Sequence, residues 1–158
     1  MKRFALILAI VATMVAVGCV SEPAPTASVP AGGEVKIAIL HVNDTHGHPL
    51  PFDNSPGIMV GGQPAIAMLV GQTRAAFENV LFLDAGDVNT GRPESNFFKA
   101  EPDIIGYNLI GLDALTLGNH EFDNELPVLE GQKALADFPF LSANVKRKDG
   151  SLVADHAY

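Results

Sequence analysis

Gly118-Asn119-His120-Glu121 directly follows a short apolar run at residues 114–117, and this stretch decides the fold. Asp44-Thr45-His46 and Gly86-Asp87 each follow a similar run earlier in the chain. A short run of aliphatic and β-branched residues is typical of a buried strand in a parallel sheet. In open α/β sheets, ligands bind beyond the carboxyl ends of the strands. We therefore expect the three polar clusters to converge at one edge of a parallel sheet.

The segments between these clusters predict the other elements. Strands are expected at 35–40, 80–83, 114–117 and 140–141, and helices at 63–77, at 102–110 and from Asp123 or Asn124 to about residue 138. The glycine- and proline-rich segment 47–62 is expected to form a long loop. The alternating order of strands and helices predicts an α/β fold, with a mainly parallel sheet and flanking helices. The positions expected to face the core are Ile66, Leu69, Val70, Thr73 and Phe77 in the first helix, Ile105, Leu109 and Ile110 in the second, and Leu126, Leu129 and Ala134 in the third.

Residues 1–18 have the pattern of a secretory signal peptide. Lys2 and Arg3 precede an apolar stretch at 4–17, which is shorter than the roughly 20 residues of a membrane-spanning helix. A buried core helix is the alternative, and a position at the very N-terminus argues against it.

Cys19 is the only cysteine, so the chain cannot form an intramolecular disulfide. Ala16-Val17-Gly18-Cys19 resembles a bacterial lipobox, which implies a lipid on Cys19. Lipoboxes usually have leucine where Ala16 stands, so cleavage by an ordinary signal peptidase remains an alternative. Residues 19–34 are expected to provide the lipidated cysteine and a flexible tether. We expect an exported protein in the periplasm, anchored to the outer membrane as a lipoprotein.

The formal net charge of the chain is −8, and it becomes −10 once Lys2 and Arg3 are removed with the signal peptide. A surface of this sign repels polyanions, which argues against a nucleic-acid polymer as a partner. A small phosphorylated substrate can still bind where metal ions reverse the local charge. Hard oxygen donors and imidazole gathered at one sheet edge suggest a site for divalent metal ions.

Three motifs carry a definite resemblance. His41-Val-Asn-Asp44-Thr-His46-Gly-His48, Asp84-Ala-Gly-Asp87-Val-Asn-Thr-Gly91 and Gly118-Asn119-His120-Glu121-Phe122-Asp123 resemble successive signatures of the calcineurin-like metallophosphoesterases. More narrowly, the chain resembles the bacterial periplasmic 5′-nucleotidase/UDP-sugar hydrolase branch. Residues 140–144 are similar to a further segment of those enzymes, and the likeness runs from about residue 35 to residue 144.

The resemblance implies two divalent metal ions, such as zinc or manganese, bridged by Asp87. Asp44 and His46 match ligands of one ion, and Asn119 matches a ligand of the other. A hydroxide activated by the two metals would attack the phosphorus of a 5′-nucleotide, a UDP-sugar or a 2′,3′-cyclic nucleotide.

His120 would act on the substrate rather than bind metal, stabilising the transferring phosphoryl group and assisting the leaving group. Asp123 would fix the tautomer of His120, or would cap the following helix, or both. Asp84, His48 and His41 are expected to support the site or the fold.

The chain also departs from the family pattern. Complete members supply further histidines downstream, whereas only His156 follows His120 here, in a context that matches none of them. We therefore expect residues 35–158 to be the N-terminal part of a metallophosphoesterase domain, truncated and inactive alone. The alternative is a non-catalytic lipoprotein remnant that binds metal or phosphate.

Overall fold

A computed structural model of the chain describes residues 33–158, within which Val35–Tyr158 form one compact unit. The signal peptide expected at 1–18, Cys19 and nearly all of the tether lie outside the described residues. Within the described part of the chain, no helix combines the length and the apolar character needed to cross a membrane.

A four-stranded parallel sheet forms the centre of the unit. Its strands are β1 (Ile37–Val42), β4 (Asn79–Asp84), β5 (Ala114–Thr116) and β6 (Phe140–Leu141), and they lie in the order β1-β4-β5-β6. Every neighbouring pair is parallel. Because these strands all run in the same direction, the loops after β1, β4 and β5 leave the sheet at the same edge. The predicted α/β class with a mainly parallel sheet and flanking helices is confirmed.

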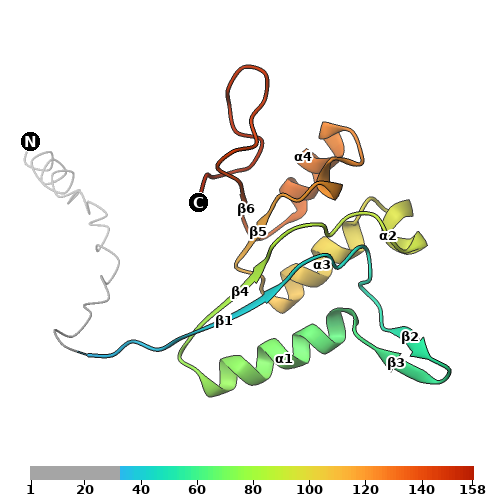
Figure 1. Ribbon diagram of the computed structural model, residues 1–158, viewed down its shortest axis with the longest axis vertical. Coiled ribbons are helices and arrows are strands. Elements are labelled where there is room, and N and C mark those ends of the chain that lie inside the picture. Colours follow the sequence, from blue (N-terminus) through green and yellow to red (C-terminus); the bar gives the residue numbers. More distant parts are fainter. Residues whose placement is uncertain (1–32) are drawn as a thin grey trace, which may run out of the picture. The chain divides into compact units, whose positions relative to one another are not determined.

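Three helices connect these strands: α1 (Gly62–Ala76), α3 (Glu101–Ile110) and α4 (Leu126–Leu135) (Figure 1). Local sequence sets their ends. Helix α3 has Pro102 in its first turn, where a missing N–H costs nothing, and Gly111, with φ 78°, is its C-cap. Helix α4 likewise has Pro127 in its first turn.

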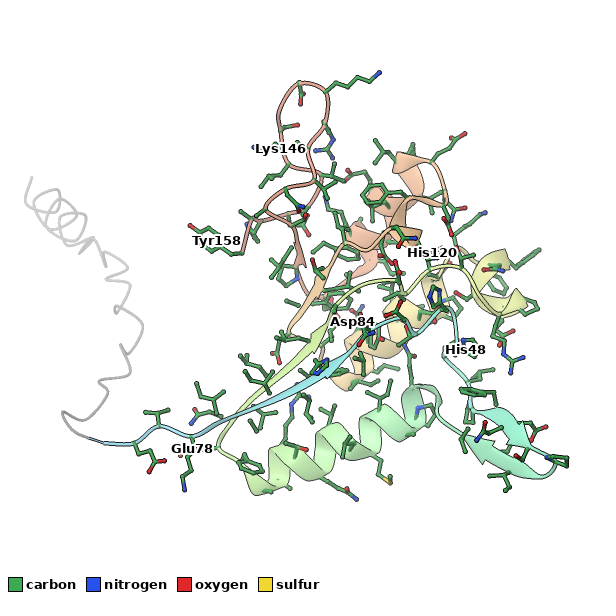
Figure 2. All side chains as sticks on the ribbon, viewed as in Figure 1. His48, Glu78, Asp84, His120, Lys146 and Tyr158 are labelled. Atoms are coloured by element: carbon green, nitrogen blue, oxygen red, sulfur yellow. The ribbon has the colours of Figure 1, made fainter. Side chains whose placement is uncertain are left out.

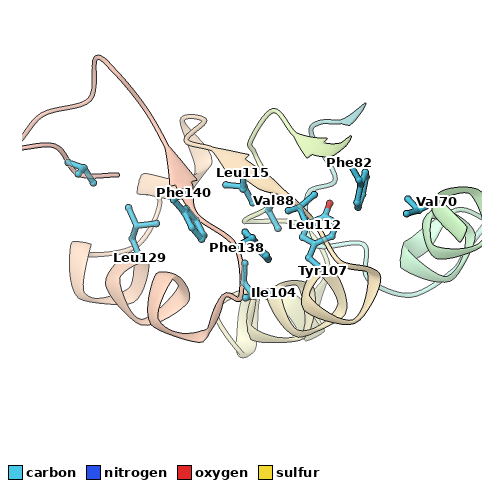
Figure 3. Close-up of a cluster of buried hydrophobic side chains, with 11 residues drawn as sticks. Val70, Phe82, Val88, Ile104, Tyr107, Leu112, Leu115, Leu129, Phe138 and Phe140 are labelled. Carbon is cyan, nitrogen blue, oxygen red and sulfur yellow. The ribbon is translucent and has the colours of Figure 1, made fainter. Parts of the chain in front are cut away.

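The hydrophobic core lies between the sheet and these helices (Figure 3). Phe82, Leu115 and Phe140 from three successive strands are buried there, together with Tyr107 of α3 and Leu129 of α4. Burial of side chains of this size supplies most of the favourable free energy of folding, about 1.5–3 kcal/mol for each. The core therefore fixes β4, β5 and β6 relative to α3 and α4, which positions the loops at their ends.

On the opposite face of the sheet, side chains of β1 and β4 are exposed. Ile37 and Ile39 of β1 are 57% and 61% exposed, and Leu81 of β4 is 41% exposed. The expectation that the apolar runs are buried strands is thus wrong for these positions. In β1, exposed residues alternate with partly buried ones, and in β4 the residues facing the helices are the more buried ones, as expected when successive side chains point to opposite faces.

Several short elements were not predicted. Residues 47–62 contain an antiparallel hairpin of β2 (Phe52–Ser55) and β3 (Ile58–Val60) rather than only a loop. Helix α2 (Pro93–Phe97) and the 3₁₀ helix η1 (His120–Phe122) follow β4 and β5.

The predicted helix start at Asp123 or Asn124 is also wrong. Asp123 ends η1, and Glu125 is the N-cap of α4.

The predicted inward faces of the helices are only partly right. Val70 and Leu129 are buried, and Ile66 and Ile110 pack against the core. The remaining apolar positions expected to face the core are exposed, namely Leu69, Phe77, Ile105, Leu109, Leu126 and Ala134. These helices are apolar over a wide arc, so the spacing alone does not indicate which part of the arc meets the sheet.

Candidate active site

Backbone hydrogen bonds join the three polar clusters at the carboxyl edge of the sheet. The Asp44 N–H donates to the Gly86 carbonyl at 3.0 Å, and the His46 N–H donates to the Asp87 carbonyl at 3.1 Å. The His120 N–H donates to Oδ1 of Asp87 at 2.9 Å. Figure 2 shows His120, His48 and Asp84 gathered at this end of the strands. Bonds from main-chain N–H groups therefore hold residues more than 30 positions apart in the sequence against one another.

The backbone at the site adopts left-handed conformations at residues other than glycine. The φ angles are 53° at Asp44, 44° at His46, 59° at Asp87 and 66° at Thr90. Such conformations are uncommon for residues with a Cβ, and for a β-branched residue they are outliers. They persist only where the surroundings hold them, and they cluster at functional sites. The left-handed conformations in the loops after β1 and β4 therefore indicate a functional site rather than a contribution to stability.

Glu121 holds the loops after β4 and β5, and sequence reasoning assigned it no role. It is 3% exposed, and its carboxylate accepts four backbone N–H bonds. Oε1 accepts from Val88 and Asn89, and Oε2 accepts from Asp87 and Gly118, at distances from 2.7 to 3.3 Å. An acidic residue five positions after the end of β5 is the only sequence signal that could have pointed to it.

Gly118 makes the close approach of the β4 and β5 loops possible. A Cβ at this position would lie 2.2 Å from Oδ1 of Asp87, far closer than any real contact. A side chain there would therefore displace the carboxylate that the motif presents.

His46, Asp87 and His120 form a group that could hold a metal ion, since one donor atom of each lies within 4.8 Å of the others. Asp44 adjoins the group, with its Oδ1 3.6 Å from Nε2 of His46. Nδ1 of His46 donates to the carbonyls of Asn89 at 3.3 Å and Thr90 at 3.1 Å. Nε2 is therefore the nitrogen left to bind an ion, which is the arrangement typical of metal-binding histidines.

The residues present thus fit a divalent cation. Asp87 lies in one group with His46, and Asp44 adjoins His46; the roles of all three as metal ligands stay predictions. Asn119 is exposed and precedes η1, and its role as a ligand stays a prediction. His120 lies close enough to join the group, so its expected role as a non-ligand also stays a prediction.

His120 and Asp123 form a hydrogen-bonded pair. Nδ1 of His120 lies 2.6 Å from Oδ2 of Asp123, and because a carboxylate only accepts, the imidazole donates. This bond raises the pKa of His120. The pKa of Asp123 is lowered, first by the Thr90 hydroxyl and then by His120. The rings of His120 and His46 pack edge to face, with 4.8 Å between their centroids. The His120–Asp123 pair therefore adjoins the metal-binding group.

The other polar residues singled out from the sequence surround this group. Asp84 is buried and accepts from the Gly86 N–H at 2.8 Å, and burial raises the pKa of Asp84 to about 6. Nδ1 of His48 donates to the carbonyls of Thr45 and His46 and so stabilises the turn that carries His46. His41 is exposed on β1.

The structure thus has an open parallel sheet with imidazole and carboxylate groups at its carboxyl edge. A comparison of the sequence with protein families gives a result consistent with this arrangement. Residues 37–156 match the profile of the calcineurin-like phosphoesterases, and the chain belongs to that family.

Particular relatives narrow the resemblance to 5′-nucleotidases. A 5′-nucleotidase of Vibrio vulnificus is 45% identical over 150 residues, which cover 92% of this chain and 26% of that protein. Protein UshA of Yersinia enterocolitica is 46% identical over 112 residues, which cover 71% of this chain and 20% of that protein. The structure of the NAD nucleotidase of Haemophilus influenzae matches 72% of this chain and 22% of its own, with a TM-score of 0.64 and 32% identity. The chain thus spans about a quarter or less of the length of these relatives.

Proposed function

We propose that this chain forms the metal-binding part of a phosphohydrolase that acts on nucleotides. The observation that carries the proposal is the placement of the His120–Asp123 pair beside the group formed by His46 and Asp87. A phosphoester hydrolase needs a site for cations next to a group that can stabilise the transferring phosphoryl and protonate the leaving oxygen. The two parts lie side by side here.

In this proposal the cofactors are two divalent metal ions, zinc, manganese or similar. When bound, they would draw charge from the phosphoryl oxygens and lower the pKa of an attacking water. Asp87 has two carboxylate oxygens and is the residue proposed to contact both ions. Asp44 and His46 would hold one ion, and Asn119 would hold the other.

His120 and Asp123 would contribute catalysis without binding metal. Asp123 accepts the Nδ1 proton of His120, so Nε2 is the ring nitrogen left to meet the substrate. The imidazolium form, favoured by Asp123, can donate a proton from Nε2 to the leaving alkoxide. A positioned acid of this kind typically contributes about 10²–10⁴ in rate.

The proposed substrates are 5′-nucleotides, with UDP-sugars and 2′,3′-cyclic nucleotides as further candidates. The names of the Vibrio vulnificus and Haemophilus influenzae relatives refer to nucleotides, which supports this class. The net charge of −8 argues against polymeric nucleic acid. We also propose that residues 1–18 direct export and that a lipid on Cys19 anchors the protein to the outer membrane in the periplasm.

The test uses this chain in place of the matching segment of the Vibrio vulnificus 5′-nucleotidase, because the chain covers only a quarter of that protein. We expect the hybrid to release phosphate from a nucleoside 5′-monophosphate with added divalent metal, and to stop when a chelator is added. Release that persists in the chelator would contradict the metal-dependent proposal. Metal binding by the chain without any release by the hybrid would favour the alternative of a non-catalytic metal-binding lipoprotein.

A further inference from the structure

Thr90 lies between the metal-binding group and the catalytic pair and contacts both. Its hydroxyl donates to Oδ2 of Asp123, the same atom that accepts from Nδ1 of His120. Its carbonyl accepts from Nδ1 of His46 at 3.1 Å. The main-chain carbonyl of Thr90 thus fixes the orientation of His46, a proposed metal ligand. The side chain of Thr90 fixes the orientation of Asp123, the carboxylate beside His120.

The backbone of Thr90 is held in a conformation that this residue type avoids. Its φ of 66° is left-handed, and a β-branched side chain makes that conformation an outlier. Strained residues persist where neighbouring structure over-determines them. Thr90 can therefore keep this conformation only if the residues on both sides of it are fixed.

Both neighbours of Thr90 are fixed. Asn89 is buried, exchanges side-chain hydrogen bonds with Gln132 and gives its N–H to Glu121. Gly91 is held by Asn96, whose side chain accepts from the Gly91 N–H at 2.9 Å and donates to its carbonyl at 3.0 Å. Hydrogen bonds thus fix the chain on each side of Thr90. This keeps the Thr90 hydroxyl in position to donate to Asp123.

We propose that Thr90 is a positioning residue that couples the orientation of the His120–Asp123 pair to that of His46. The inference rests on the proposed function and deepens it. The hydroxyl restrains Asp123, a half-exposed side chain that would otherwise sample several rotamers, and Asp123 in turn keeps the proton of His120 on Nδ1. Nε2 of His120 then stays available on the side that faces substrate.

The structure offers matched variants for a test. Thr90→Val keeps the shape, the branched Cβ and the carbonyl but removes the hydroxyl, whereas Thr90→Ser keeps the hydroxyl. Thr90→Gly also removes the hydroxyl and relieves the left-handed strain, so it serves if Thr90→Val does not fold. Thr73→Val is the control, because Thr73 of α1 bonds only to the Leu69 carbonyl within its own helix.

The first readout does not depend on turnover. In the 158-residue chain, long-range ¹H–¹⁵N correlation spectra at an alkaline pH show which ring nitrogen of each neutral imidazole carries the proton. We expect Nδ1–H for His120 in the unmodified chain, in Thr90→Ser and in Thr73→Val, and a mixture of tautomers in Thr90→Val and Thr90→Gly. His46 should keep Nδ1–H in all of them, because the Thr90 carbonyl is retained. An unchanged His120 tautomer in both variants without the hydroxyl would overturn the proposal.

The second readout is kinetic and uses the Vibrio vulnificus hybrid. Thr90→Val is expected to lower kcat by about 10- to 100-fold with KM and metal content unchanged, the usual cost of losing a contact behind the reacting groups, and Thr90→Ser should restore it. An equal loss in Thr90→Ser would mean that the residue is merely structural and would overturn the proposal. If the unmodified hybrid is inactive, the proposed function fails, and the tautomer of His120 still decides the positioning role of Thr90.

Discussion

At the scale of single residues, side chains that are not proposed to contact the substrate hold the loops of the site in place. Glu121 satisfies four backbone N–H groups from two loops with one carboxylate. A buried carboxylate is costly unless it is hydrogen-bonded, and four donors provide that compensation. Glu121 thus stabilises the left-handed turn at Asp87, which is the residue proposed to contact both metal ions.

Asp103 in the first turn of α3 gives a prediction about pH. Burial raises the pKa of Asp103 from 3.8 to about 6, against the opposing effect of the Ser95 hydroxyl. Between these two values the folded chain binds a proton that the unfolded chain has released, so the free energy of unfolding falls as the pH rises through this window. Asp103→Asn is expected to raise stability at pH 7 by on the order of 2 kcal/mol and to flatten this part of the pH profile.

Urea unfolding at pH 4 and pH 7 measures this effect. Glu101→Gln is the matched control, because Glu101 lies in the same helical turn but is exposed. Equal stability of Asp103→Asn and the unmodified chain at both pH values would show that the ionised Asp103 carboxylate does not destabilise the fold.

At the scale of helices and strands, the sequence predicts order and direction better than it predicts burial. The apolar runs before Asp44, Asp87 and Asn119 predict the strands that precede the site, because an aliphatic run followed by polar residues has few other solutions in an α/β fold. The partly buried row of β1 and the buried row of β4 could not be predicted, since both faces of these strands carry apolar residues.

The residues that support the site could not be identified from the sequence either. Glu121 and Thr90 act through partners more than 30 positions away, at Asp87 and Asp123. No local pattern encodes such a contact. The proposed ligands stand out because their types and spacing resemble a known family, whereas a hydrogen bond between two loops becomes apparent only once the loops are placed.

Leu81 and Phe82 test the one-sided burial of the sheet. These neighbours in β4 lie on opposite faces, Leu81 41% exposed and Phe82 1% exposed. Phe82→Ala is expected to cost about 3–5 kcal/mol of stability, as core truncations do, whereas Leu81→Ala should cost less than about 1 kcal/mol. Thermal and urea unfolding of the 158-residue chain compare the two, and a larger loss for Leu81→Ala would mean that this face is covered in solution.

At the scale of the whole molecule, the chain combines an acidic domain with an N-terminal segment that has the pattern of an export signal. The carboxyl edge of the sheet gathers Asp44, His46, Asp87 and His120. A concentration of acid and imidazole at one edge of a chain with net charge −8 needs cations before it can attract a phosphate.

The proposed membrane anchor depends on one atom, the sulfur of Cys19. Cys19→Ser is expected to release the mature protein from the membrane fraction or to leave its uncleaved precursor, because serine cannot carry the lipid. Fractionation of cells that produce each form, followed by mass measurement of the N-terminal peptide, provides the readout. A Cys19→Ser protein that fractionates with membranes as before, at the mature mass, would contradict the anchor.

The measurement that tests the central claim most directly compares Asp87→Ala with His120→Ala for metal content per chain and, in the hybrid, for phosphate release. Asp87 is the residue proposed to contact both ions, so Asp87→Ala should lose metal and turnover together. His120 is proposed to contact only the phosphoryl group, so His120→Ala should keep its metal while kcat falls by about 10²–10⁴. Loss of metal from a folded His120→Ala chain would show that His120 is itself a metal ligand and would contradict the account.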